Sequence, residues 1–260
     1  MSSAEEGNMA YAVIFGCIVV LGLPLNAASL WILIQRHRLK SPSAVIMINL
    51  ALADLLLVLS LPTRVYYYAT GTWSLGVFTC ICISSLFSNN IRASVIFITF
   101  IGVDQLLAVV FPLSSRHLRN TTNSWRACGL IWISLVAEQI APSLNYVNSC
   151  FVFTLLAVNC ISTSMVSWKL RSHLSDSVQV VNKMNVMLIF AMNLLMFFIF
   201  FLPVSLVLSV EEWRVAVEPA LCLASMNCCF DPLLYYFSLD SFWKKKEDDK
   251  ARPNGIHSRS

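Results

Sequence analysis

Seven apolar stretches, each long enough to cross a lipid bilayer as a helix, constrain this sequence more than any other feature. They span residues 9–35, 43–69, 77–111, 123–143, 150–170, 184–209 and 214–237. About 20 apolar residues cross the hydrocarbon core, and backbone amides in lipid must be satisfied within the segment, so each stretch is predicted to be helical. Only 12% of the residues are charged, about half of the share in soluble domains. The predicted fold is therefore an all-α membrane protein, a seven-transmembrane helix bundle.

The basic residues predict how the bundle is oriented. Of the 18 lysines and arginines, 15 fall in or beside the connections on one side and in the C-terminal tail, whereas the N-terminal tail and residues 70–76 and 144–149 contain none. The positive-inside rule makes the basic side cytosolic. We therefore expect a multi-pass plasma-membrane protein with an extracellular tail at 1–8, a membrane domain at 9–237 and a cytosolic segment at 238–260. The net charge of +4 then reflects topology, and no nucleic acid is expected as a partner.

The cytosolic segment begins with an amphipathic pattern. Phe242 and Trp243 precede three lysines that start at Lys244. This pattern is typical of a short helix on the inner membrane face, with its aromatic side chains in lipid and its lysines near anionic headgroups. A solvated run of charge is the alternative.

Signatures of catalysis are missing from the sequence. It contains no glycine-rich phosphate loop, no G-x-S-x-G turn and no H-E-x-x-H, the motifs that carry nucleotide, hydrolase and zinc chemistry. The four histidines, at 37, 117, 173 and 257, all lie in connections or in the tail. The protein is not expected to be an enzyme or to hold a histidine-bound metal.

Polar residues inside the predicted spans are the strongest functional signal. Ionisable groups in hydrocarbon are costly and mark functional sites by default. The residues concerned are Asn26 in the first span, Asp54 in the second, Ser94 in the third, and Asn227 and Asp231 in the seventh.

Seven motifs occur along the predicted spans in a familiar order. They are Gly22-x-x-x-Asn26, Asn49-Leu-Ala-Leu-Ala-Asp54, Cys80, Asp104 with the later Leu-Ala-Val-Val-Phe-Pro-Leu, Trp132, Phe197-x-x-Phe-Phe-Leu-Pro203 and Asp231-Pro-x-x-Tyr235. The chain resembles a rhodopsin-like (class A) G protein-coupled receptor. Further segments, such as Leu61-Pro-Thr-Arg64, are similar to the branch that holds lysophosphatidic acid receptors and purinergic (nucleotide) receptors.

The resemblance assigns roles to several of these residues. It implies a heterotrimeric G protein as partner, a disulfide between Cys80 and Cys150, and Na⁺ bound by Asp54, Ser94, Asn227 and Asp231; an ion-free, hydrated network is the alternative. Because proline removes a backbone donor, Pro203 and Pro232 are expected to bend the sixth and seventh spans. Activation residues are then Asp104, position 105, Phe197, Pro203, Pro232 and Tyr235, although Phe197 and Phe201 could equally be core packing.

Two arginines inside the spans are candidates for ligand recognition. Arg64 is the first choice, because a guanidinium near the outer mouth of the bundle suits a phosphate or carboxylate. Arg92 either contacts the ligand or pairs with Glu138. An apolar ligand tail would lie against Phe87, Ile91, Phe201, Val204 and Leu221. The predicted ligand is an anionic lipid, similar to lysophosphatidic acid, or a nucleotide-like molecule.

The sequence departs from the family pattern at two important places. The Asp-Arg-Tyr motif of the family is here Asp104-Gln105-Leu106, which lacks the arginine charge. The connection from Leu144 to Cys150 is much shorter than in most members. A non-signalling variant, acting as a decoy or as a trafficking partner of a related receptor, is therefore the alternative function.

Overall fold

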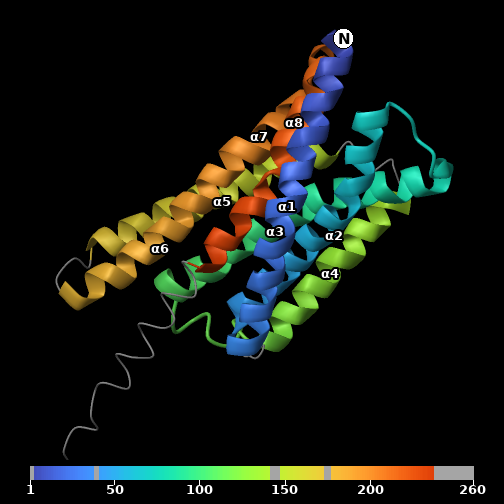
Figure 1. Ribbon diagram of the computed structural model, residues 1–260. Helices are drawn as coiled ribbons and strands as arrows, with labels where there is room; N and C mark the ends of the chain where they lie inside the picture. Colours follow the sequence, from blue (N-terminus) through green and yellow to red (C-terminus); the bar gives the residue numbers. More distant parts are fainter. Residues whose placement is uncertain (1–2, 38–40, 141–146, 173–176, 237–260) are drawn as a thin grey trace, which may run out of the picture.

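The computed structural model describes residues 3–37, 41–140, 147–172 and 177–236. Every regular element within these ranges is a helix (Figure 1). The α-helices are α1 (Ser3–His37), α2 (Pro42–Thr70), α3 (Gly76–Val110), α4 (Thr121–Ile140), α5 (Val147–Ser172), α6 (Ser177–Met196), α7 (Leu202–Ser209) and α8 (Val217–Ser225). A π-helical turn, η2 (Phe197–Phe201), joins α6 to α7, a 3₁₀ turn, η3 (Glu211–Ala216), precedes α8, and a last helix covers 227–236.

These elements form the seven expected spans, so the predicted all-α, seven-helix fold is confirmed. The sixth span consists of α6, η2 and α7, and the seventh of α8 with helix 227–236. By length and hydropathy, five described segments can cross a membrane: Asn8–Gln35, Pro42–Thr70, Gly76–Val110, Val152–Leu170 and Val186–Ser209. The fourth span carries Arg126 and Glu138, and a turn at Met226 divides the seventh into two short helices.

The second helix forms the centre of the bundle. It packs against α1, α3 and α4, while α3 in turn packs against α4, α5 and α6. The buried share of the span is 78% for α2 but only 22% for α1. In Figure 1 the lower parts of α5 and α6 extend away from the remaining helices. The core that positions the candidate site therefore lies around α2 and α3.

The outer surface of the bundle is far more apolar than that of a water-soluble protein. Large apolar side chains point outward, among them Val20 (71% exposed), Leu130 (68%) and Trp168 (72%). The side chains of Asp54 and Asp231 are completely buried. Soluble monomers rarely expose continuous apolar surface of this extent, so the outer surface suits the hydrocarbon of a bilayer.

Both of the last two spans contain irregular backbone, and in the sixth span it has a local cause in proline chemistry. The π-helical turn ends two residues before Pro203, as expected where a proline lacks its backbone donor. In the seventh span the break is at Met226 and not at Pro232. Pro232 cannot donate to the carbonyl of Cys228, and the Asn26 side chain donates to that carbonyl instead, at 2.7 Å. The helix is interrupted at Met226, six residues before Pro232, and the bend expected at Pro232 stays a prediction.

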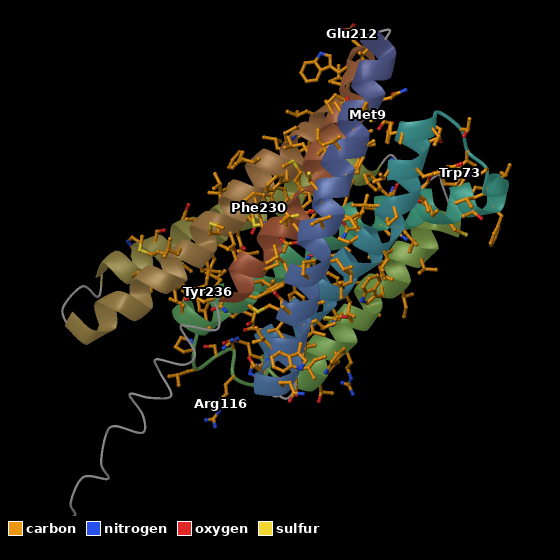
Figure 2. The ribbon with its side chains drawn as sticks, viewed as in Figure 1. Met9, Trp73, Arg116, Glu212, Phe230 and Tyr236 are labelled. Atoms are coloured by element: carbon orange, nitrogen blue, oxygen red, sulfur yellow. The ribbon has the colours of Figure 1, made fainter. Side chains whose placement is uncertain are left out.

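The two ends of the bundle carry different residues. Met9, Trp73 and Glu212 lie at what we call the upper end, and Arg116 and Tyr236 lie toward the lower end (Figure 2). Residues 1–2 and 237–260, with the predicted tail helix, lie outside the described residues.

Candidate functional site

A cavity of about 340 Å³ lies in the upper half of the bundle. It is lined by Ser88, Ile91, Arg92, Val95, Val152, Phe201, Val204, Ser205, Leu208 and Leu221. Four of the five residues predicted to contact an apolar tail (Ile91, Phe201, Val204 and Leu221) are among them. Most of the wall is aliphatic or aromatic, as is usual for a site that buries a small ligand.

Arg64 lies beside this cavity and not in its wall. Its guanidinium carbon is 3.9 Å from the ring centroid of Phe87, a cation–π contact. Phe87 is 1% exposed and lies one helical turn above Ile91, which lines the cavity. Among the described residues, the buried Nε atom of Arg64 has no hydrogen-bond partner. Phe87, the fifth residue predicted to contact the ligand tail, therefore packs against Arg64, the residue predicted to bind the head group.

Arg92, by contrast, contributes directly to the wall of the cavity. The side chain of Glu138, its alternative partner, lies outside the described side chains. Both of its predicted roles, ligand contact and ion pairing, stay predictions.

The predicted polar residues are all buried inside the bundle. Asn26, Asp54, Ser94, Asn227 and Asp231 are all 0% exposed. The Asn227 side chain donates to an Asp231 oxygen at 3.2 Å, and Asp54 and Asp231 lie near enough for their carboxyl groups to interact. Helices far apart in sequence thus contribute to one buried cluster.

This cluster has more acceptors than donors. Buried oxygens without a hydrogen-bond partner include one carboxylate oxygen of Asp54, one of Asp231, the hydroxyl of Ser94 and the amide oxygen of Asn227. Two neighbouring carboxylates repel each other unless a proton or a cation lies between them. Oxygen ligands suit a hard cation, so these residues fit Na⁺ as well as they fit ordered water.

At the lower end, Asp104 has a partner that sequence reasoning did not predict. The Arg119 side chain donates two hydrogen bonds to its carboxylate, at 2.8 and 3.0 Å, in the bidentate geometry that favours arginine. The Ser43 hydroxyl donates a third, at 2.5 Å. Gln105 is 8% exposed. Asp104, which lacks the neighbouring arginine of the family motif, is thus paired with Arg119 from the α3–α4 connection.

Comparison with known proteins places the chain in a family. Residues 25–146 match the family model described as 7 transmembrane receptor (rhodopsin family). Lysophosphatidic acid receptor 4 of Mus musculus is 31% identical over 89% of this chain and 75% of its own length. Lysophosphatidic acid receptor 6 of the same species is 30% identical over 89% and 81%, and a purinoceptor of Xenopus laevis is 39% identical over 52% and 25%.

The chain belongs to the rhodopsin family of seven-transmembrane receptors. Its matches lie in the branch that the sequence motifs predicted, and these relatives are receptors and not enzymes. The receptor is accordingly a multi-pass membrane protein without a catalytic role.

Aromatic packing beneath the cavity of the receptor agrees with the predicted arrangement. Phe197 and Phe201 are both 0% exposed, with ring centroids 5.8 Å apart in an edge-to-face contact. Tyr235 is 1% exposed, and its hydroxyl has no hydrogen-bond partner. These contacts show where the residues lie, while their roles in activation stay predictions.

The predicted disulfide joins one residue whose side chain the structure describes and one whose side chain it does not. Cys80 is an exposed, free thiol at the upper end of α3, and the side chain of Cys150 lies outside the described side chains. The bridge in the oxidised receptor therefore stays a prediction.

Two further polar features, both in the interior of the bundle, were not predicted from the sequence. Asn90 donates to Asp54 at 3.2 Å, and its place one turn before Ser94 could have identified it. The other is a group of buried amides between α3, α5 and α6, where Asn159 donates to the Thr99 hydroxyl at 2.8 Å and both side-chain amide atoms of Asn193 lack a partner. No sequence motif predicts this second group.

Proposed function

We propose that the receptor binds a lysophospholipid through the cavity in its upper half. The observation that carries this proposal is the apolar cavity of about 340 Å³ with a guanidinium one helical turn above it. The acyl tail would occupy the cavity, and Arg64 would bind the phosphate. Relatives named as lysophosphatidic acid receptors support this class of ligand.

A nucleotide fits the same cavity less well. Its base and ribose need several hydrogen-bonding partners, whereas the wall offers mainly Ile91, Val95, Phe201 and other apolar side chains. Burying polar groups without partners costs affinity. The similarity to a purinoceptor keeps nucleotides as the second candidate.

We further propose a plasma-membrane location with the upper end outside. The lower end carries Arg116 and Arg119 in the α3–α4 connection and Arg126 in the first turns of α4, which fits the positive-inside rule. The ligand would then enter from the extracellular side or from the outer leaflet, and a heterotrimeric G protein would bind below.

Direct binding tests the ligand proposal without depending on signalling. Purified receptor would be titrated with lysophosphatidic acid, a lysophospholipid with a larger head group, ATP and UDP, and bound ligand would be measured by scintillation proximity. Saturable binding of a lysophospholipid supports the proposal. Saturable binding of a nucleotide alone would contradict it.

The substitution Gln105→Arg distinguishes a signalling receptor from a decoy. If position 105 limits coupling, the variant should raise ligand-dependent guanine-nucleotide exchange several-fold, because the arginine charge of the family motif is restored beside Asp104. The exchange rate of a purified G protein with the receptor in nanodiscs measures this. Exchange that stays at the background level in both forms would favour the decoy function.

We also propose that the polar cluster around Asp54 and Asp231 binds Na⁺. At a concentration ten times the Kd, mass action would stabilise the folded receptor by about 1.4 kcal/mol, so its melting temperature should rise with NaCl but not with N-methylglucamine chloride of equal ionic strength. Asp54→Asn should abolish the difference. A wild-type receptor that melts alike in both salts would instead indicate an ion-free, hydrated cluster.

A further inference from the structure

The upper end of the receptor carries a carboxylate close to the proposed phosphate site. Glu218, in the first turn of α8, accepts a hydrogen bond of 2.5 Å from the Tyr68 hydroxyl. Tyr68 follows Arg64 by four residues on α2 and so lies on the same helix face, one turn nearer the upper end. The Tyr68 hydroxyl contacts Glu218 directly, and Arg64 lies one helical turn below Tyr68 on the same face of α2. A cation and an anion therefore flank one tyrosine.

Both charged side chains lie directly above the cavity. Leu221, which lines the cavity, follows Glu218 by three residues on α8. Ile91 also lines it and lies one turn below Phe87, on whose ring Arg64 rests. A lipid whose tail occupied the cavity would therefore bring its head group toward Arg64 and Glu218.

The two charges do not neutralise each other by direct contact. Within the described part of the chain, the ion pair found is that of Arg119 with Asp104 at the lower end, and the Nε atom of Arg64 lacks a hydrogen-bond partner. The Glu218 side chain is exposed. Each group is thus placed to bind a complementary charge on a ligand.

Aromatic rings complete the surroundings of the carboxylate. The ring centroid of Tyr68 is 5.4 Å from that of Tyr11 and 5.7 Å from that of Phe15. Aromatic faces attract organic cations, and a carboxylate does so more strongly. A purely anionic head group would satisfy Arg64 but would be repelled by Glu218.

A simpler role for Glu218 is structural. An acidic residue in the first turn of a helix interacts favourably with the helix dipole, and the bond to Tyr68 links α8 to α2. This role needs the hydrogen bond, but it does not depend on the ligand. The two roles therefore differ in what they predict for ligands of different charge.

We propose that the head group recognised by the receptor is zwitterionic, with its phosphate on Arg64 and its ammonium group on Glu218. The inference rests on the proposed lysophospholipid function and narrows it to head groups of the phosphoethanolamine type. Tyr68 holds the carboxylate of Glu218 in place between the two helices.

Competition binding with two lipids of equal tail tests this assignment. The probes are 1-oleoyl lysophosphatidylethanolamine and 1-oleoyl lysophosphatidic acid, and the quantity measured is the ratio of their affinities. The wild-type receptor should prefer the ethanolamine lipid. Glu218→Gln should reduce the ratio by about tenfold, because the hydrogen bond to Tyr68 can remain while the charge is lost.

Two further variants distinguish an effect of the Glu218 charge from an effect on the folded structure. Glu212→Gln removes an exposed carboxylate at the same end of the bundle and should leave the ratio unchanged. Tyr68→Phe removes the hydrogen bond but keeps the charge, so it should weaken both lipids more than it changes their ratio. If both lipids bind and Glu218→Gln leaves the ratio as in wild type, the zwitterion assignment is wrong while the proposed function stands. If neither lipid binds wild-type receptor, both fail.

Discussion

Replacing Arg119 by alanine is expected to lower the melting temperature of the receptor by roughly 3–10 °C. The reason is that Asp104 is 4% exposed and would lose two charge-assisted hydrogen bonds of 2.8 and 3.0 Å. Breaking a fully buried ion pair costs about 3–5 kcal/mol. Because the Arg119 side chain is 23% exposed, solvent screening reduces the expected cost in free energy of unfolding to about 1–3 kcal/mol.

Two variants control this measurement, made by differential scanning fluorimetry in one detergent. Arg116→Ala removes an exposed arginine of the same connection and should change the melting temperature little. Adding Asp104→Asn to Arg119→Ala should recover much of the loss, because asparagine leaves no unpaired charge. Equal melting temperatures for Arg119→Ala and Arg116→Ala would show that the pair contributes nothing.

The second large effect concerns the ligand. Arg64→Ala should weaken the binding of a phosphate-bearing lysophospholipid by about one to two orders of magnitude, since a hydrogen bond to a charged group contributes roughly 1.5–3 kcal/mol. Arg64→Lys should recover only part, because lysine cannot bind phosphate in bidentate fashion. Equilibrium binding to purified receptor measures both.

Arg92 provides the comparison for this experiment. It lines the cavity itself, whereas Arg64 rests on the Phe87 ring beside it. If Arg64→Ala binds as well as wild type and Arg92→Ala binds at least tenfold more weakly, the phosphate lies deeper, in the cavity. If both variants melt at the wild-type temperature, any loss of affinity reflects ligand recognition and not a loss of folded receptor.

Much of the fold follows from the sequence because lipid simplifies the problem. A long apolar run in hydrocarbon has only the helix available to it, so seven runs predict seven helical spans. Residue-level irregularities were less predictable. The interruption of the seventh span at Met226 has no proline signal at that position, and the bond from the Asn26 side chain to the carbonyl that Pro232 leaves free was not predicted.

The candidate site was also predictable only in part from the sequence. Periodicity along single helices predicted the face that lines the cavity, since Ile91, Phe201, Val204 and Leu221 all reach it. Contacts between helices depend on how each helix is rotated about its axis relative to its neighbours. This rotation cannot be inferred from a single sequence. The contact of Arg64 with the Phe87 ring and the contacts of Arg119 and Glu218 were therefore not predicted.

The bond from Asn26 to the Cys228 carbonyl also has a consequence for biogenesis. It joins residues 202 positions apart, and an alanine-sized group at Gly22 would lie 3.3 Å from the Cys228 sulfur. The first of the described helices thus carries a polar side chain whose partner is synthesised 202 residues later. Until the seventh span is inserted, the Asn26 amide lacks this long-range partner.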